Sequence, residues 1–171
     1  MSVARRHNPS QPGLYSETER QRRDSSPWTL VQGVLAPLQF LIFVVSLGLV
    51  LRTLITGEGV FAAHVSILLK TFALYTIMVT GSLWEKDVFG QYLFAPAFFW
   101  EDVVSFVVIG LHTLYLTGLI FGYLSNFQLF AVTLAAYATY VVNAGQFLLK
   151  LRAARLQAGA SIATPMTEGA R

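Results

Sequence analysis

The chain has 171 residues, of which 54% are hydrophobic and 12% are charged, and its formal net charge is +3. A soluble domain carries roughly 25% charged residues, so the composition favours an integral membrane protein. The absence of cysteine excludes thiolate nucleophiles, disulfides, thiolate-bound zinc and cysteine-ligated iron–sulfur clusters. The positive charge comes mainly from arginines near the two ends, without a basic helix or a basic–aromatic repeat, so membrane orientation explains it better than nucleic-acid binding.

Residues 1–27 are polar, with five arginines and three prolines. They lack the apolar stretch of a signal peptide. The first apolar run begins after Trp28 and is too long for such a stretch, so we expect it to remain as a membrane span. Residues 1–27 are therefore predicted to be a polar cytoplasmic tail.

Four apolar runs follow, each with the roughly 20 residues that a helix needs to cross the hydrocarbon. They cover about residues 30–51, 61–83, 103–123 and 127–149. Short turns at 56–59 and 125–126 join the first two and the last two, which makes the last two helices antiparallel neighbours. The sequence predicts an all-α membrane domain of four transmembrane helices over residues 28–152, followed by a disordered cytoplasmic tail over 153–171.

Lysine and arginine lie almost entirely on one side of these predicted helices. Five arginines precede the first span, Lys86 follows the second, and Lys150, Arg152 and Arg155 follow the fourth, whereas the other side has only Arg52. The positive-inside rule places both termini and the connection between spans two and three in the cytoplasm.

That connection holds four of the nine carboxyl-bearing residues of the chain, whereas the apolar spans contain none. The four are Glu85, Asp87, Glu101 and Asp102. Glu101 and Asp102 can simply cap a helix whose dipole favours anions, and Glu85 and Asp87 can lie in a solvated turn. The alternative is acid–base chemistry, because the five aromatic rings of residues 88–99 would desolvate a carboxyl group and keep it protonated as a general acid. These rings also suit a flat apolar substrate that enters from the membrane.

One face of the third span carries a stripe with four- and three-residue spacing. It consists of Glu101, Ser105, Val108, His112 and Tyr115. The stripe runs from the cytoplasmic interface to the middle of the membrane, so we expect it to face the other helices.

Lys70 and His112 lie at mid-membrane depth, and no carboxylate in any span can pair with Lys70. An intramembrane ionisable residue is a functional candidate by default. The alternatives are a neutral or snorkelling lysine and an interhelical hydrogen bond from the histidine. His64 lies roughly 10 Å from His112 in depth, so the two make a poor pair of haem ligands. No metal site with several protein ligands can be assembled convincingly.

Four amides lie toward the cytoplasmic half of the spans. Gln32 and Gln39 share one face of the first helix, and Asn143 and Gln146 share one face of the fourth. Amides at membrane depth need hydrogen-bond partners. Helix–helix hydrogen bonding explains each of them, but their common depth also indicates a polar pocket that binds a substrate.

Three stretches of the chain resemble one protein family. They are residues 26–40 (SPWTLVQGVLAPLQF); residues 84–86, 89–90 and 92–102 of the central connection; and residues 136–144 with 146–152. Residues 14–156 are similar in this way to the 2-vinyl (3-vinyl) bacteriochlorophyllide hydratase family of bacteriochlorophyll biosynthesis. The resemblance implies a multi-pass protein of the bacterial inner (cytoplasmic or intracytoplasmic photosynthetic) membrane. It also implies addition of water to the vinyl group of a chlorophyllide, which gives a 1-hydroxyethyl group.

The chemistry of that reaction suits the carboxylates. A proton must reach the terminal vinyl carbon, and a base must help water to add to the resulting cation, so two carboxyl groups suffice without a cofactor. We expect Glu101 or Glu85 to be the acid and Asp102 or Asp87 to be the base.

The substrate has features that the remaining candidates could bind. Lys70 could meet its propionate and His112 could ligate its magnesium, which belongs to the substrate. Glu101 and His112 are about 16 Å apart along the helix, so the magnesium role is weaker than the carboxylate role. Gln32, Gln39, Asn143 and Gln146 are further candidates for substrate binding.

Two other classes of protein fit parts of the pattern. A bacteriochlorophyll-binding or assembly protein would hold pigment through His112 without changing it. A four-helix transporter is weaker, because no internal repeat supports it. The expected partners are the chlorophyllide and the bilayer, and not nucleic acid; a homo-oligomer or association with other pigment-biosynthesis enzymes stays open.

Overall fold

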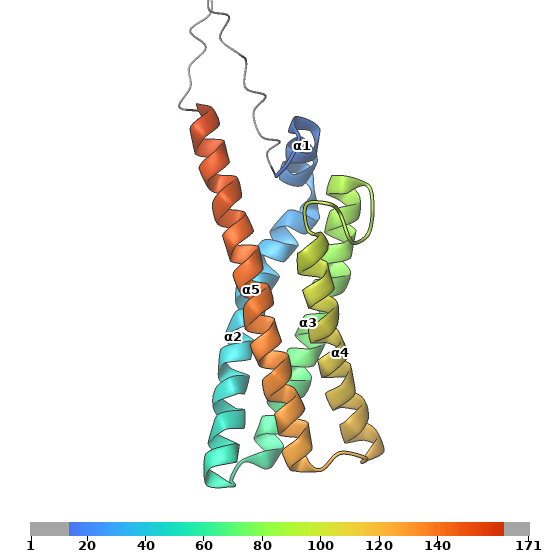
Figure 1. The fold of residues 1–171 in the computed structure, drawn as a ribbon, viewed down its shortest axis with the longest axis vertical. Helices are drawn as coiled ribbons and strands as arrows, with labels where there is room; N and C mark the ends of the chain where they lie inside the picture. Colours follow the sequence, from blue (N-terminus) through green and yellow to red (C-terminus); the bar gives the residue numbers. More distant parts are fainter. Residues whose placement is uncertain (1–13, 163–171) are drawn as a thin grey trace, which may run out of the picture.

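The computed structural model of the chain describes residues 14–162, and the side chains as far as residue 156. Within this range the chain forms five helices and no strands. They are α1 (Glu17–Ser25), α2 (Pro27–Thr56), α3 (Val60–Phe89), α4 (Phe99–Phe121) and α5 (Asn126–Ile162). The four long helices run alternately up and down side by side, and α1 lies at one end of them (Figure 1).

All four long helices are long and apolar enough to cross a membrane. Only 22–39% of the residues in their most apolar stretches are buried inside the bundle. Because most of their apolar side chains face outward, the helices suit lipid rather than water on their outer surfaces. The predicted all-α architecture with four candidate membrane helices is confirmed.

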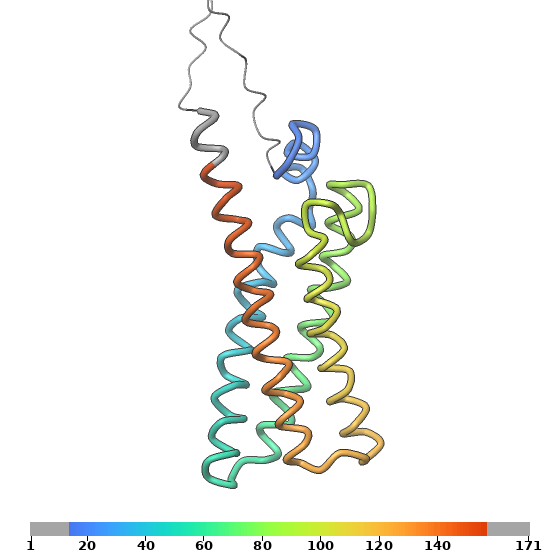
Figure 2. Tube along the Cα trace, in the orientation of Figure 1, coloured from blue at the N-terminus to red at the C-terminus, as the bar shows by residue number. Residues whose placement is uncertain are grey.

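The two ends of the bundle differ. One end, here called the tail end, carries α1, the connection 90–98 and the last turns of α5, whereas the opposite end, the turn end, carries the two short turns (Figure 2). At the turn end Gly57 closes α2 with a φ of 73°, a left-handed conformation that glycine adopts without steric cost. Gly90 closes α3 at the tail end in the same way, with a φ of 83°.

The helices pack mainly as two antiparallel hairpins, α2 on α3 and α4 on α5. Two buried clusters join the hairpins. One contains Phe43, Leu74, Val108, Ala136, Tyr137 and Tyr140, and the other contains Val50, Ala63, Ile67, Tyr115, Leu129 and Phe130. The predicted stripe on α4 is confirmed as the buried face of that helix.

The structure differs from the sequence-based boundaries in three places. Helix α3 continues to Phe89 and α4 begins at Phe99, so the four carboxylates lie on helix ends and the connection has only residues 90–98. Helix α5 runs to Ile162, so residues 153–162 are helical rather than a disordered tail; their four alanines and Leu156 favour a helix.

The third difference is α1, which lies inside the expected polar tail. Its signal was present in the sequence: Ser16 and Glu19 form a capping box, in which each side chain bonds the backbone N–H of the other. Residues 1–13 and 163–171, which hold the ends of the two predicted tails, lie outside the described residues.

Candidate functional site at the tail end of the bundle

Three of the four predicted carboxylates meet at the tail end. Glu85 comes from the last turns of α3, and Glu101 and Asp102 come from the first turn of α4. Each has an exposed fraction of only 4–5%. Lys150 of α5 lies beside them and within electrostatic range of both Glu85 and Asp102. The site is therefore built where α3, α4 and α5 converge.

Glu85 and Asp102 form a hydrogen-bonded pair of carboxyl groups. Asp102 also accepts the backbone N–H of Phe94 at 2.7 Å, and Glu85 accepts that of Ala95 at 3.2 Å. Two carboxylates in contact repel each other unless they share a proton. Asp102 has the shorter backbone hydrogen bond, which favours its ionised form, so Glu85 is the member of the pair better suited to carry the shared proton.

The backbone that holds this pair is strained. Phe94 has a φ of 60°, which is uncommon for a residue with a bulky side chain. Its N–H nevertheless points at the Asp102 carboxylate. Strain of this kind persists where surrounding contacts fix the backbone, and such positions cluster at functional sites.

Glu101 is occupied by an ion pair. Its carboxylate lies 2.5 Å from Nζ of Lys150, which also donates to the carbonyl of Ala97 and lies 4.9 Å from the centre of the Phe98 ring. The ion pair fixes Glu101 in place and leaves Glu85 and Asp102 as the two carboxyl groups that contact each other.

Five aromatic rings pack against one another at the same end of the bundle. Phe98 lies between Trp84, Phe89 and Phe147, with ring centres 5.5–5.9 Å away, and Tyr15 stacks on Phe89 at 5.8 Å. Sequence reasoning gave no role to Tyr15, which precedes α1 in the chain. The capping box that begins α1 is the signal that could have located it.

Asp87 lies apart from the other three carboxylates. Two residues after Glu85 on the same helix, it points to the opposite side, is exposed, and accepts a hydrogen bond from Ser26 at 2.9 Å. Asp87 therefore links the end of α3 to the start of α2.

The four amides fall into two separate pairs. Gln32 donates to Thr80 at 2.8 Å, and Gln39 is buried on the same helix, α2. Asn143 donates to Ser105 at 2.7 Å, and Gln146 lies one turn further along α5. Only Asn143 and Gln146 are on a helix that contributes to the carboxyl site.

Lys70 and His112 lie deeper in the bundle, in its packed interior. Lys70 is fully buried, with Nζ 3.6 Å from the centre of the Tyr140 ring and no hydrogen-bond partner among the described residues. His112 is 1% exposed and its Nδ1 donates to the carbonyl of Val108 at 2.8 Å. His64 bonds Tyr115 at 2.6 Å. Within the described part of the chain, no three His, Asp or Glu residues are placed to hold a metal ion.

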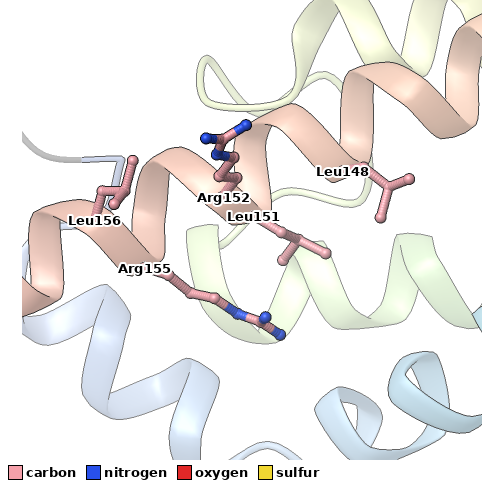
Figure 3. Close-up of a pocket in the computed structure, with 5 residues that line it drawn as sticks. All are labelled: Leu148, Leu151, Arg152, Arg155 and Leu156. Carbon is pink, nitrogen blue, oxygen red and sulfur yellow. The ribbon is translucent and has the colours of Figure 1, made fainter.

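A cavity of about 450 Å³ opens on α5 at the tail end (Figure 3). It is lined by Leu148, Leu151, Arg152, Arg155 and Leu156. Leu148 and Arg152 each lie two residues from Lys150, so this face of α5 points away from the carboxyl site. The cavity is therefore separate from the site.

Comparisons with known proteins identify the family. A model of the 2-vinyl bacteriochlorophyllide hydratase family matches residues 15–153. The chain belongs to this family. The matched segment begins at Tyr15 and extends past Lys150, so it includes every residue of the site described above.

Two relatives carry the name 2-vinyl bacteriochlorophyllide hydratase. The protein from Rhodobacter capsulatus is 70% identical over 151 residues, which cover 88% of each chain. The protein from Cereibacter sphaeroides is 69% identical over 143 residues, which cover 84% of this chain and 89% of the relative. No solved structure matches the chain. The family resemblance of the sequence motifs is thus confirmed.

Proposed function

We infer that this chain hydrates the vinyl group of a bacteriochlorophyllide to a 1-hydroxyethyl group, a hydro-lyase reaction of bacteriochlorophyll biosynthesis. The names of two relatives about 70% identical to it support this function. The structural observation that carries the mechanism is the buried, hydrogen-bonded pair of Glu85 and Asp102. Such a pair supplies the acid and the base that a hydration needs.

The proposed reaction begins with proton transfer. Glu85 gives its proton to the terminal vinyl carbon, whose π electrons form the new C–H bond. The positive charge that remains on the other vinyl carbon is delocalised into the macrocycle and is stabilised by the two carboxylates, which are now both ionised. The pair therefore supplies the proton to the vinyl group and also stabilises the cation that results.

Water then adds to the cation through its oxygen. One of its protons passes to Asp102, and the hydrogen bond between the two carboxyl groups returns that proton to Glu85. The net change is the addition of one water molecule, with no electron transfer. We therefore assign no cofactor of the protein to the reaction; the magnesium belongs to the substrate.

The surrounding groups provide the charge balance and the apolar surroundings that the carboxyl pair needs. Lys150 holds Glu101 as an ion pair, so a third negative charge next to the pair is balanced. The rings of Phe98 and Trp84, which pack edge to face at the same end of the bundle, supply apolar surroundings that suit a chlorin macrocycle. Asp87, which bonds Ser26, has no part in this proposal.

Lys70 and His112 also lie outside the protonation step. Nε2 of His112 has no hydrogen-bond partner among the described residues, and its Nδ1–H is held by Val108. That tautomer is the one that can ligate a metal. Both residues are enclosed between helices, however, so magnesium at His112 or a propionate at Lys70 would require α3, α4 and α5 to separate.

We propose that the tail end faces the cytoplasm, in the inner or intracytoplasmic membrane of a photosynthetic bacterium. This orientation is supported by Lys86, Lys150, Arg152 and Arg155 at the tail end, against Arg52 at the turn end. A substrate could then enter the site from either the membrane or the cytoplasm.

The test is hydration in water labelled with heavy oxygen. Membranes that contain the full chain are incubated with vinyl bacteriochlorophyllide and no added cofactor, and the product is analysed by mass spectrometry. Label in a hydroxyethyl group supports the proposal. Tightly bound pigment of unchanged mass would instead favour a pigment-binding protein.

A further inference from the structure

Two buried amide oxygens lie next to the carboxyl site without a donor. Oδ1 of Asn143 and Oε1 of Gln146 are both buried, and neither accepts a hydrogen bond from a described residue. Asn143 as a whole is 7% exposed. Because the two residues are three apart on α5, their side chains lie on the same face of that helix.

Their contacts place this face against the start of α4. Asn143 donates to Ser105 at 2.7 Å, and Lys150 pairs with Glu101 at 2.5 Å. Gln146 lies on α5 between Asn143 and Lys150. Ser105 is three residues after Asp102 on α4, so Asp102 and the two oxygens lie within about one helical turn of one another along the bundle.

Helix–helix bonding explains only half of this arrangement. The amide nitrogen of Asn143 joins α5 to α4, but the two oxygens serve no such bond. Buried polar atoms are almost always satisfied, and where protein donors are lacking an ordered water usually supplies the hydrogen bond. A site for water needs two to four polar partners, and two acceptors side by side fit the two O–H groups of one water molecule.

We propose that Asn143 and Gln146 are positioning residues that hold the water molecule which adds to the vinyl group. This inference rests on the proposed hydratase function. Their oxygens accept hydrogen bonds from both O–H groups, which leaves the lone pairs of the water oxygen free to bond the cationic carbon. Amide oxygens do not take a proton at neutral pH, so after C–O bond formation one O–H group turns from its amide oxygen to Asp102, which accepts the released proton.

The experiment separates protonation from the addition of water. In deuterium oxide, protonation followed by reversal places deuterium on the terminal carbon of the unreacted vinyl group. Protonation followed by water addition gives hydroxyethyl product instead. Mass spectrometry of recovered substrate and product gives both rates, and a titration of pigment absorbance gives the dissociation constant of the substrate.

The test variants are Gln146→Met and Asn143→Ala in the full chain. We expect hydration to fall about 10- to 100-fold, as for the loss of a hydrogen bond in the transition state. Deuterium exchange should fall much less, so the ratio of exchange to hydration rises by nearly the factor by which hydration falls, with an unchanged dissociation constant. Gln146→Glu, which keeps an acceptor, should restore much of the lost hydration. Gln146→Met carries the test alone if Asn143→Ala fails to fold.

Gln128→Met is the matched control. It makes the same substitution at the turn end of α5, where Gln128 accepts the N–H of Ser125 at 2.9 Å, so the ratio should stay at its original value. Equal falls in exchange and hydration in Gln146→Met, or an equal rise of the ratio in Gln128→Met, would overturn the role in holding water. Absence of both exchange and hydration in the unmodified protein would instead overturn the hydratase function itself.

Discussion

Replacing Glu85 by glutamine removes the transferable proton with almost no change in shape. The amide can still donate to Asp102 and accept the N–H of Ala95, so both hydrogen bonds of the native side chain have a replacement. We therefore expect the free energy of unfolding to change by less than about 1 kcal/mol. The affinity for the substrate should also be retained.

Turnover, in contrast, should collapse. Removing a general acid typically costs about 100- to 10,000-fold in rate, which corresponds to about 2.7–5.4 kcal/mol of activation free energy. The upper part of this range is expected, because burial shields the pair from water that could replace it as a proton donor. Asp102→Asn should cost a similar factor. The double variant should be little worse than either single one, because groups that act as a unit are not additive.

The assay is the rate of formation of labelled hydroxyethyl product in membranes. Thermal unfolding and pigment titration provide separate readings of folding and binding. Glu58→Gln is the control, because Glu58 is an exposed carboxylate at the turn end, 3.7 Å from Arg52. If Glu85→Gln kept more than a tenth of the original turnover, the pair could not be the source of the proton and the mechanism would be refuted.

Three further substitutions test the other polar residues. Asp87→Asn should leave turnover within about threefold, as for an ordinary surface change; a tenfold loss in the same assay would return Asp87 to the site. Lys150→Met leaves Glu101 without its cation and should lower the free energy of unfolding by about 1–3 kcal/mol, measured by thermal unfolding in detergent; addition of Glu101→Gln should recover part of this loss. Lys70→Met removes an unpaired buried amine and should raise the melting temperature. If Lys70→Met instead raised the KM of the free acid substrate but not that of its methyl ester, Lys70 would be assigned to the propionate.

The motifs of the sequence located the candidate site but could not select the reacting pair. Glu85, Asp87, Glu101 and Asp102 all stayed candidates as long as Glu85 and Asp87 were placed in a turn after the second span. Helix α3 continues to Phe89, so Glu85 and Asp87 both lie on it. Residues two positions apart on a helix point about 200° apart around its axis. Glu85 therefore faces α4, and Asp87 faces the start of α2.

The role of Lys150 also depended on packing. In the sequence it counted only as a positive charge beyond the last span, one of several that indicate orientation. In the structure it lies 2.5 Å from Glu101, which is 49 residues away in the chain. Such a pairing depends on how α4 and α5 are rotated against each other, and one sequence read alone does not contain that rotation.

The sequence by itself determined the four spans, because lipid requires about 20 consecutive apolar residues to form a helix whose backbone groups bond one another. It also determined the family, because the long motifs are continuous stretches of sequence that can be recognised without the structure. Only the tertiary structure decided which carboxylates meet, that Tyr15 stacks on Phe89, and that two amide oxygens of α5 have no donor among the described residues. These facts depend on the rotation and depth of each helix against its neighbours, and packing between residues distant in the chain sets both.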